Sequence, residues 1–287
     1  MSVLSVQNLI HSYETGTPFE TRALDGVNFD FENGKIIALI GHTGSGKSTL
    51  LKHLNGLLKP ESGDVLLDGK SIFENKKTLY DCRFRVGLCF QYPEQQLFES
   101  TVYRDVAFGP SNMKLSAEEI DRRVRRAVEF VGLPDRSLEK SPFDLSGGQK
   151  RRAAIAGVLA MEPEVLILDE PTAGLDPSGK KALLELIKHY NAETGSTVIF
   201  VSHNMDDVAY LADQVVVMDE GKIVLHGDVG YVFSHAKELC EMGLDIPEIT
   251  RLFLELKKQG IDVPDGVFTL EDAAEALLSY LGKGART

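Results

Sequence analysis

The sequence predicts an α/β fold with four parts: an N-terminal antiparallel β section, a core with buried parallel strands, a helical subdomain inserted into that core, and a small helical C-terminal extension. Two observations carry this prediction. Short apolar runs at 36–40, 165–168 and 197–201 each end at glycines or polar residues, which is typical of parallel strands that deliver functional groups to one edge of a sheet. Residues from about 92 to 160, and again beyond about 236, show a helical pattern instead.

These patterns divide the chain at about residue 235. Residues 1–235 are expected to form one α/β domain, interrupted by the helical subdomain at about 92–160. Near its end, two apolar runs on either side of a turn at 219–222 predict a closing β-hairpin. The remaining residues, 236–287, form the extension. With 287 residues, 43% of them hydrophobic, the chain is long enough to bury a large core and to carry this appendage.

A glycine-rich segment follows the first buried run and matches the pattern G-x-x-x-x-G-K-[ST]. Its residues are Gly41, His42, Thr43, Gly44, Ser45, Gly46, Lys47 and Ser48. Such a loop turns backbone N–H groups toward the phosphates of a nucleoside triphosphate, and the following helix points its positive end at the same anion. We expect Lys47 to bind between phosphates and Ser48 to ligate Mg²⁺, and we include Thr49 among the nucleotide-binding residues. The alternative is a glycine-rich turn without a ligand. The preceding strand and the helix-forming residues 48–54 favour the nucleotide site.

A second glycine-rich element, Leu145-Ser146-Gly147-Gly148-Gln149, lies far downstream. Ser146 and Gln149 have the spacing of a capping box, in which the two side chains close the start of a helix. A cap does not explain the two glycines, since each costs roughly 1 kcal/mol relative to alanine in a helix. We therefore expect their backbone to approach a ligand closely. The basic residues at 150–152 oppose the helix dipole unless an anion or carboxylates compensate them.

The second element resembles the Leu-Ser-Gly-Gly-Gln signature of ATP-binding-cassette ATPases, and the other motifs of that family follow in the family's order over nearly the whole chain. The resemblance implies a P-loop NTPase that binds ATP and Mg²⁺ and hydrolyses ATP. It implies that Asp169 holds Mg²⁺ through water and that Glu170 polarises the attacking water. His203 would contact the γ-phosphate, and Lys47 is counted with Glu170 and His203 as catalytic.

The same resemblance assigns three further positions and a dimeric mechanism. Tyr13 would stack on adenine, Gln91 would reach the metal, and Asp176 would lie in a loop that crosses a dimer interface. In the implied sandwich, each chain supplies a phosphate loop to one ATP. The facing chain covers the γ-phosphate with its helix start at Ser146–Gly148, so hydrolysis needs two chains.

The segments 90–98, 101–102, 107–110 and 146–163 narrow the resemblance. They are similar to the ATP-binding subunits of energy-coupling factor transporters, in particular to the second of the two ATPase subunits that those systems pair. This implies an importer motor for a vitamin or a transition-metal ion, bound peripherally at the cytoplasmic face of a prokaryotic cell membrane. The implied partners are a second ATP-binding subunit, a transmembrane coupling protein and a substrate-binding membrane component, with no nucleic acid.

Three other functions are compatible with part of these motifs. The first is an ATP-binding-cassette ATPase of another importer class. The second is a soluble nucleic-acid or translation ATPase, although these usually carry two cassettes or a long coiled-coil insertion. The third is a kinase-type or GTP-binding module, which has no reason to carry the element at 145–149.

The segment from Gln91 to Phe98 is expected to contact the coupling protein. Tyr92, Leu97 and Phe98 offer apolar anchors, and Glu94 offers a charge for a basic residue on an incoming helix. The alternative is a buried loop whose aromatic residues fill the space between subdomains.

Composition favours a cytoplasmic protein. No apolar run approaches ~18 to 20 residues, and the N-terminus lacks a basic segment followed by an apolar one, so we expect neither a membrane span nor a secretion signal. The three cysteines are too few and too scattered for a disulfide framework, so free thiols are expected. The net charge of −12 disfavours nucleic acid as a partner.

The extension predicts two amphipathic helices. Pro247 opens the first and Gly260 ends it, and the second starts at Thr269. Because two short helices do not fold alone, their apolar stripes are expected to dock on the core or on another chain, where they would hold two ATPase chains together. The stripes consist of Ile249, Leu252, Phe253 and Leu256 in the first helix and Leu270, Ala273, Leu277 and Leu281 in the second.

Overall fold

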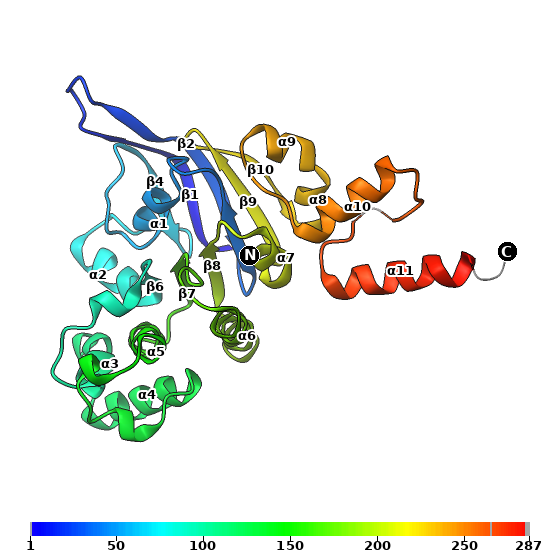
Figure 1. Ribbon diagram of the computed structural model, residues 1–287. Coiled ribbons are helices and arrows are strands. Elements are labelled where there is room, and N and C mark those ends of the chain that lie inside the picture. The colour runs from blue at the N-terminus through cyan, green and yellow to red at the C-terminus, as the bar shows by residue number, and fades with distance from the viewer. Residues whose placement is uncertain (1, 265, 285–287) are drawn as a thin grey trace.

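A six-stranded sheet with the order β10-β9-β3-β8-β7-β6 forms the centre of the molecule (Figure 1). The structure is a computed structural model that describes residues 2–264 and 266–284. Strands from β9 to β6 pair in parallel, and β10 pairs antiparallel with β9, which confirms the predicted hairpin. The strands are β3 Ile36–Ile40, β6 Val86–Cys89, β7 Val165–Asp169, β8 Thr197–Val201, β9 Gln214–Asp219 and β10 Lys222–Asp228. All residues of β3 and β8 are buried, because helices or a second sheet cover both faces.

A second, four-stranded sheet is antiparallel and has the order β2-β1-β4-β5, as predicted for the N-terminal section. Its strands are β1 Ser2–Tyr13, β2 Thr21–Glu32, β4 Ser62–Leu67 and β5 Lys70–Ser71. The hairpin of β1 and β2 projects from the body in Figure 1. The predicted α/β class is confirmed.

The two faces of the central sheet bury different partners. Ile37 and Leu39 of β3 belong to a core shared with the antiparallel sheet and helix α1 (Lys47–Leu54). Ala38 and Ile40 of the same strand belong to a core shared with the helices on the opposite side. This alternation follows from the two-residue period of a strand, and it fixes the end of β3 between the two cores. The loop at 41–46 starts from that fixed point.

The predicted helical insertion packs against the second of these cores. Its elements, together with the preceding helix α2, are α2 Lys76–Arg85, η1 Pro93–Gln96, α3 Val102–Asn112, α4 Ala117–Phe130, η2 Asp135–Ser137, η3 Pro142–Asp144 and α5 Gly147–Leu159. Helices α3 and α4 both contact α5, and Val106, Val124 and Ala156 are fully buried among them. Ser116 caps α4 by accepting a hydrogen bond from the backbone N–H of Glu119.

The helices of the second half of the core are α6 Pro177–Thr194, α7 Met205–Leu211, α8 Val229–Ser234 and α9 Ala236–Glu241. Burial in the main core continues beyond α9, because Leu244 and Ile246 still belong to it. The separately packed part of the chain therefore begins near Pro247. The division at residue 235 stays a prediction.

The two helices predicted for the extension are present as α10 Glu248–Lys258 and α11 Leu270–Gly284, and they extend away from the sheets in Figure 1. The extension touches the main domain at two points: the backbone N–H of Glu248 donates to Asp206 Oδ1, and Phe268, between the two helices, packs against the main core. Phe253, Ala273, Val263 and Val267 form a small separate core, with Ile249, Leu256 and Leu277 packed against it. The side chain of Leu281 lies outside the described residues.

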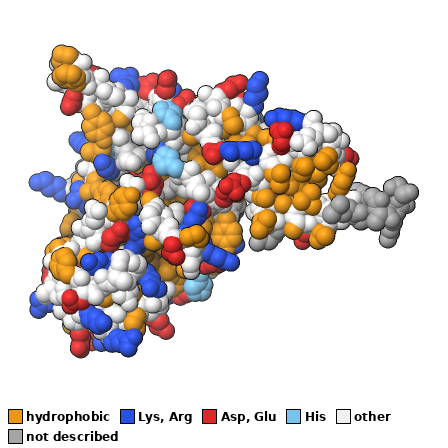
Figure 2. Space-filling view, viewed as in Figure 1, with side chains coloured by type: hydrophobic (Ala, Val, Ile, Leu, Met, Phe, Trp, Pro, Cys, Tyr) orange, Lys and Arg blue, Asp and Glu red, His pale blue; other side chains and the backbone are white. Residues whose placement is uncertain are grey.

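Hydrophobic side chains remain at the surface of the extension. Figure 2 shows hydrophobic atoms gathered over this part of the molecule. Leu270 and Leu278 are 70% and 69% exposed, and Leu252 is also exposed. Within the described residues, no helix is both long and apolar enough to cross a membrane.

Candidate active site

The loop that follows β3 has the strained conformation expected of a phosphate-binding loop. Gly41, Gly44 and Gly46 all have positive φ, at 157°, 88° and 101°. A Cβ on Gly46 would collide with the carbonyl oxygen of Ala23, and a Cβ on Gly41 would collide with that of Met218. Glycine is therefore required at both positions by the chain itself, and α1 begins directly after Gly46.

Lys47 is buried at the base of this loop. Its Nζ donates hydrogen bonds to the carbonyl oxygens of Gly41, at 2.7 Å, and His42, at 2.8 Å. Burial lowers the pKa of Lys47, and the nearby charges of Glu170 and Asp169 partly offset this shift. The loop thus holds one cation whose position is set by two backbone carbonyls, a suitable arrangement for binding an oxyanion.

Asp169 ends β7 opposite the start of α1. The Ser48 hydroxyl donates a 3.4 Å hydrogen bond to Asp169 Oδ2. Burial, and secondarily the charge of Glu170, raise the pKa of Asp169 above its usual range. A divalent cation would offset the cost of burying the negative charge of Asp169. The hydroxyl oxygen of Ser48 and the carboxylate oxygens of Asp169 are ligands that Mg²⁺ prefers. In the described part of the chain, no three His, Cys, Asp or Glu side chains cluster as a metal site. The residues present therefore fit a metal that also takes ligands from phosphate and water.

Glu170 lies at the centre of a short hydrogen-bond chain. Its Oε2 accepts a 2.8 Å hydrogen bond from Gln91 Nε2, and its Oε1 lies 2.9 Å from His203 Nε2. Glu170 also adopts a left-handed backbone conformation, with φ 48°, which is uncommon for a residue with a side chain. Two donors fix the orientation of the carboxylate, so it can accept a proton from a water molecule in a defined position.

Gln91 thus contacts Glu170 in this structure. The hydrogen bonds of the described residues do not join Gln91 to Ser48 or Asp169. The contact between Gln91 and a metal ion therefore stays a prediction.

Tyr13 lies beside α1, at the end of β1. Its hydroxyl is 3.2 Å from the Thr49 hydroxyl, and its ring makes an edge contact with His11. Tyr13 is 40% exposed, so part of the residue is accessible to a planar ligand. His42 of the phosphate loop is tied to Asp219 at the end of β9 by a 2.8 Å contact, a partner that sequence reasoning missed.

The second glycine element forms the start of α5. Ser146 and Gln149 make the predicted capping box, which is confirmed. A Cβ built on Gly147 or Gly148 meets no atom within 4 Å, and both residues are exposed. The chain itself therefore does not require glycine there, which leaves approach by something outside the chain as the reason for these residues.

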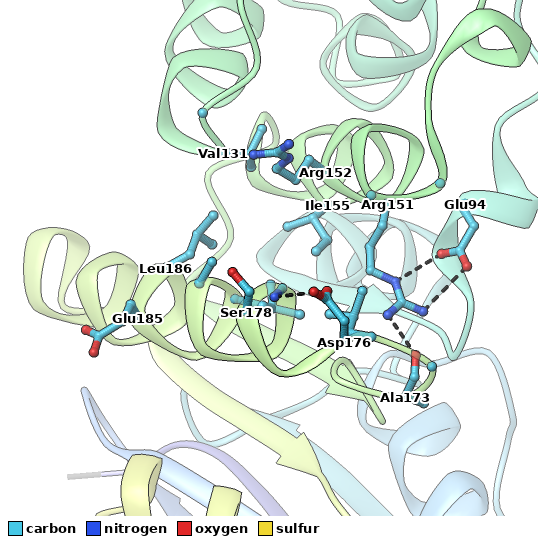
Figure 3. Close-up of a pocket in the computed structure, with 18 of the residues that line it drawn as sticks. Glu94, Val131, Arg151, Arg152, Ile155, Ala173, Asp176, Ser178, Glu185 and Leu186 are labelled. Atoms are coloured by element: carbon cyan, nitrogen blue, oxygen red, sulfur yellow. Dashed lines mark hydrogen bonds and ion pairs between the residues drawn. The ribbon is translucent and has the colours of Figure 1, made fainter.

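Asp176 caps α6 by accepting a hydrogen bond from the backbone N–H of Gly179. Together with Gly147 and Gly148 it borders an open cleft of about 930 Å³ between α5 and α6 (Figure 3). Within the described residues, no hydrogen bond joins the start of α5 to the phosphate loop.

Glu94 corrects one expectation. The sequence predicts that it offers its charge to a basic residue on an incoming helix, but the structure pairs it with Arg151 of the same chain, at 3.1 Å. The positive residues at the start of α5 require compensation by a carboxylate, and Glu94 supplies it for Arg151. That requirement was the signal in the sequence, although it did not identify the partner.

Comparisons with known proteins agree with this geometry. A family model described as "ABC transporter" matches residues 24–173. The energy-coupling factor transporter ATP-binding protein EcfA2 of Clostridium perfringens is 52% identical, and the alignment covers 97% of this chain and 98% of the relative. The protein of the same name from Clostridioides difficile is 50% identical, with 99% of each covered.

Solved structures give the same result. The structure of cbiO1 from Clostridium perfringens, described as part of the ABC transporter complex cbiONQ, has a TM-score of 0.75 and 42% identity, and covers 90% of this chain and 97% of that chain. A dimeric ATP-binding cassette in a post-hydrolysis state with ADP and Pi has a TM-score of 0.70 and 28% identity, and covers 79% and 98%.

Proposed function

Because this chain belongs to the ABC transporter ATPases, and among them to the energy-coupling factor transporter ATP-binding proteins, we propose that it is the motor subunit of an importer. It hydrolyses ATP, and this hydrolysis is coupled to transport. The proposal concerns the cargo and the partners: uptake of a vitamin or a transition-metal ion through a membrane complex. The observation that carries it is the 52% identity over almost the full length of both chains.

The proposed chemistry begins with binding of the triphosphate. The backbone N–H groups of the loop 41–46 and the Lys47 ammonium hold the phosphates. Mg²⁺, when bound, supplies positive charge beside the phosphates, and Ser48 and Asp169 are the residues that would hold it. Tyr13 packs against the adenine ring.

The hydrolytic step is assigned to Glu170. Its carboxylate accepts the proton of the attacking water while Gln91 and His203 keep it in place. His203 carries a second ring nitrogen and is the proposed contact to the γ-phosphate. These two contacts restrain rotation of the carboxylate and so keep it aligned for the reaction.

A second ATP-binding chain completes the site. The exposed glycines at 147 and 148 and the loop ending at Asp176 are proposed to cover an ATP held by the facing chain. Two observations on the described residues support this assignment: no hydrogen bond joins the start of α5 to the phosphate loop, and the space over both glycines is open.

The proposed contact with the membrane component lies on the helical subdomain. Phe98 is 61% exposed and makes an edge contact with Phe108, which is 49% exposed, so two aromatic rings face solvent together. Such rings are suitable anchors for a helix of another protein. Leu97 instead packs against the core, and Glu94 is paired with Arg151. Of the predicted apolar anchors, Tyr92 and Phe98 remain exposed.

Purification of the complex through this chain tests the proposal. The full-length chain, expressed with its neighbouring membrane proteins and extracted in mild detergent, should bring down a second ATPase chain and membrane proteins. Mass spectrometry of the extract should identify a bound vitamin or metal ion. Recovery of the chain alone would favour the alternative of a soluble ATPase. Recovery with nucleic acid that dissociates at high salt would favour the same alternative.

A further inference from the structure

Arg151 is a buried charge that connects three segments of the chain. It lies on α5, two residues after the capping Gln149, and its side chain is only 6% exposed. Its Nε and Nη2 donate to the two carboxylate oxygens of Glu94, at 3.1 and 3.4 Å. Its Nη1 donates to the carbonyl oxygens of Ala173, at 2.8 Å, and Pro171, at 3.3 Å. Figure 3 shows the guanidinium between Glu94 and Ala173.

Each of these partners is next to a group of the proposed active site. Glu94 is in η1, which directly follows the segment of Gln91. Pro171 directly follows Glu170. Ala173 is three residues after Glu170, and its backbone N–H donates to the carbonyl oxygen of Glu170. Arg151 itself is on the helix whose first turn carries the exposed glycines.

The chemistry of arginine suits this arrangement. A planar guanidinium offers five N–H donors in fixed directions and binds a carboxylate in bidentate fashion, whereas an ammonium does not. Stability alone does not require such a group, because replacing a buried ion pair with apolar residues is often neutral or stabilising. The three directions in which Arg151 donates are therefore better explained by what they hold in place.

We infer that Arg151 is a positioning residue, which holds the loop after Glu170 and the segment after Gln91 in a fixed relation to the start of α5. The inference rests on the proposed two-chain site. There, Glu170 acts on one ATP, while the glycines of the same chain cover the other. Arg151 then links the two nucleotide sites through a single side chain, and its loss displaces the carboxylate without removing any group that binds ATP.

The test must separate positioning from the plain stability of a buried ion pair. Arg151→Met leaves the Glu94 carboxylate without its partner and is expected to lower thermal stability. The double variant Arg151→Met/Glu94→Gln removes the orphaned charge and should recover most of the lost stability. Steady-state ATP hydrolysis by the full-length chain in its purified complex gives kcat and KM, and isothermal titration gives ATP affinity.

For the double variant we expect kcat to fall by about tenfold or more, with KM and ATP affinity within about twofold of wild type. Arg125→Met is the matched control, because it removes an exposed arginine and its ion pair with Asp121 from the same subdomain. It should leave kcat, KM and ATP affinity unchanged.

A double variant that regains both stability and wild-type kcat would overturn the inference, since the ion pair would then be structural only. Weakened ATP affinity with unchanged kcat would overturn it as well. If the wild-type complex itself fails to hydrolyse ATP, the proposed function fails and this inference fails with it. The wild-type arm of the same assay therefore distinguishes the two failures.

Discussion

Replacing Glu170 by glutamine removes the proposed base while keeping the shape of the side chain. The carboxylate accepts one hydrogen bond from Gln91 and faces His203 with its other oxygen. A glutamine at 170 can keep its oxygen toward His203 and turn its NH₂ group toward Gln91. Rotation of the Gln91 amide by half a turn then restores the second hydrogen bond.

The magnitudes separate the two effects of this change. If the Gln91 amide could not rotate, the lost hydrogen bond would cost about 0.5–1.5 kcal/mol. Loss of a general base lowers turnover by ~10²–10⁴-fold. At about 1.4 kcal/mol for each factor of ten, this corresponds to ~2.7–5.4 kcal/mol in the barrier. The chemical effect therefore exceeds the structural one.

ATP binding is expected to survive. The charge of Glu170 is one cause of the raised pKa of Asp169, so it also acts at the phosphate site, and a neutral residue there removes one source of repulsion of an anionic nucleotide. The variant should bind ATP at least as tightly as wild type. In the proposed sandwich it should also accumulate as a closed, ATP-bound pair of chains.

Steady-state hydrolysis in the purified complex and isothermal titration of ATP measure the two quantities separately. Glu193→Gln is a suitable control, because it neutralises an exposed carboxylate of α6 that pairs with Arg126, away from the site. A Glu170→Gln variant that hydrolyses ATP within a few-fold of wild type would refute the assignment of the base.

Four further predictions follow from the same structure. Lys47→Ala should weaken ATP binding by about 10- to 100-fold, because a charge-assisted hydrogen bond to phosphate is lost; unchanged affinity by titration would contradict the phosphate-loop assignment. Removal of residues 247–287 should weaken association of nucleotide-free chains more than ATP binding, as measured by sedimentation; a lower melting temperature with an unchanged oligomer equilibrium would instead assign the extension to this chain's own stability. Phe98→Asp should reduce co-purification of the membrane component by at least about tenfold while folding and ATP affinity stay normal, and undiminished recovery would place the contact elsewhere. Burial, with a smaller contribution from the charge of His11, lowers the pKa of the fully buried His53. Below pH ~6.5 the unfolded chain therefore binds more protons at this residue, and the free energy of unfolding should fall as pH drops from about 7 to 5. The free energy of unfolding of His53→Leu, measured by urea denaturation, should depend less steeply on pH than that of wild type. An equally steep dependence would show that the lowered pKa of His53 is not its cause.

Local motifs in the sequence predicted the parts of the fold that depend on local chemistry. The loop at 41–46 joins a fully buried strand to a helix, and the sequence predicts both neighbours. Its glycines adopt positive φ, which glycine does without the steric cost that other residues have. The capping box of Ser146 and Gln149 is equally local, since both partners lie within one helical turn.

Contacts between distant segments were not predictable in this way. Arg151 and Glu94 are 57 residues apart, and only the folded arrangement of α5 and η1 brings them together. The sequence indicated that the charge on Arg151 needed compensation, but several carboxylates could have supplied it. The sequence alone therefore leaves the charge of Glu94 available for a basic residue of another protein.

The extension shows a third kind of difference. Its helices were predicted from their apolar periodicity, but the period does not say which surface a stripe contacts. The core and a second chain were the two expected partners, whereas Phe253 and Ala273 share a small core of their own. Exposed Leu270 and Leu278 lie outside that core and remain available for a second chain.

ATP-driven uptake by the purified complex is the most direct test of the proposed motor function. The complex, isolated through this chain and placed in lipid vesicles, would be supplied with ATP and with the vitamin or metal ion found in the extract. Wild-type complex should accumulate that substrate only when ATP reaches the side of the membrane that carries this chain, and the Glu170→Gln complex should not. Uptake that is independent of ATP, or equal for the two complexes, would contradict the assignment of this chain as the motor.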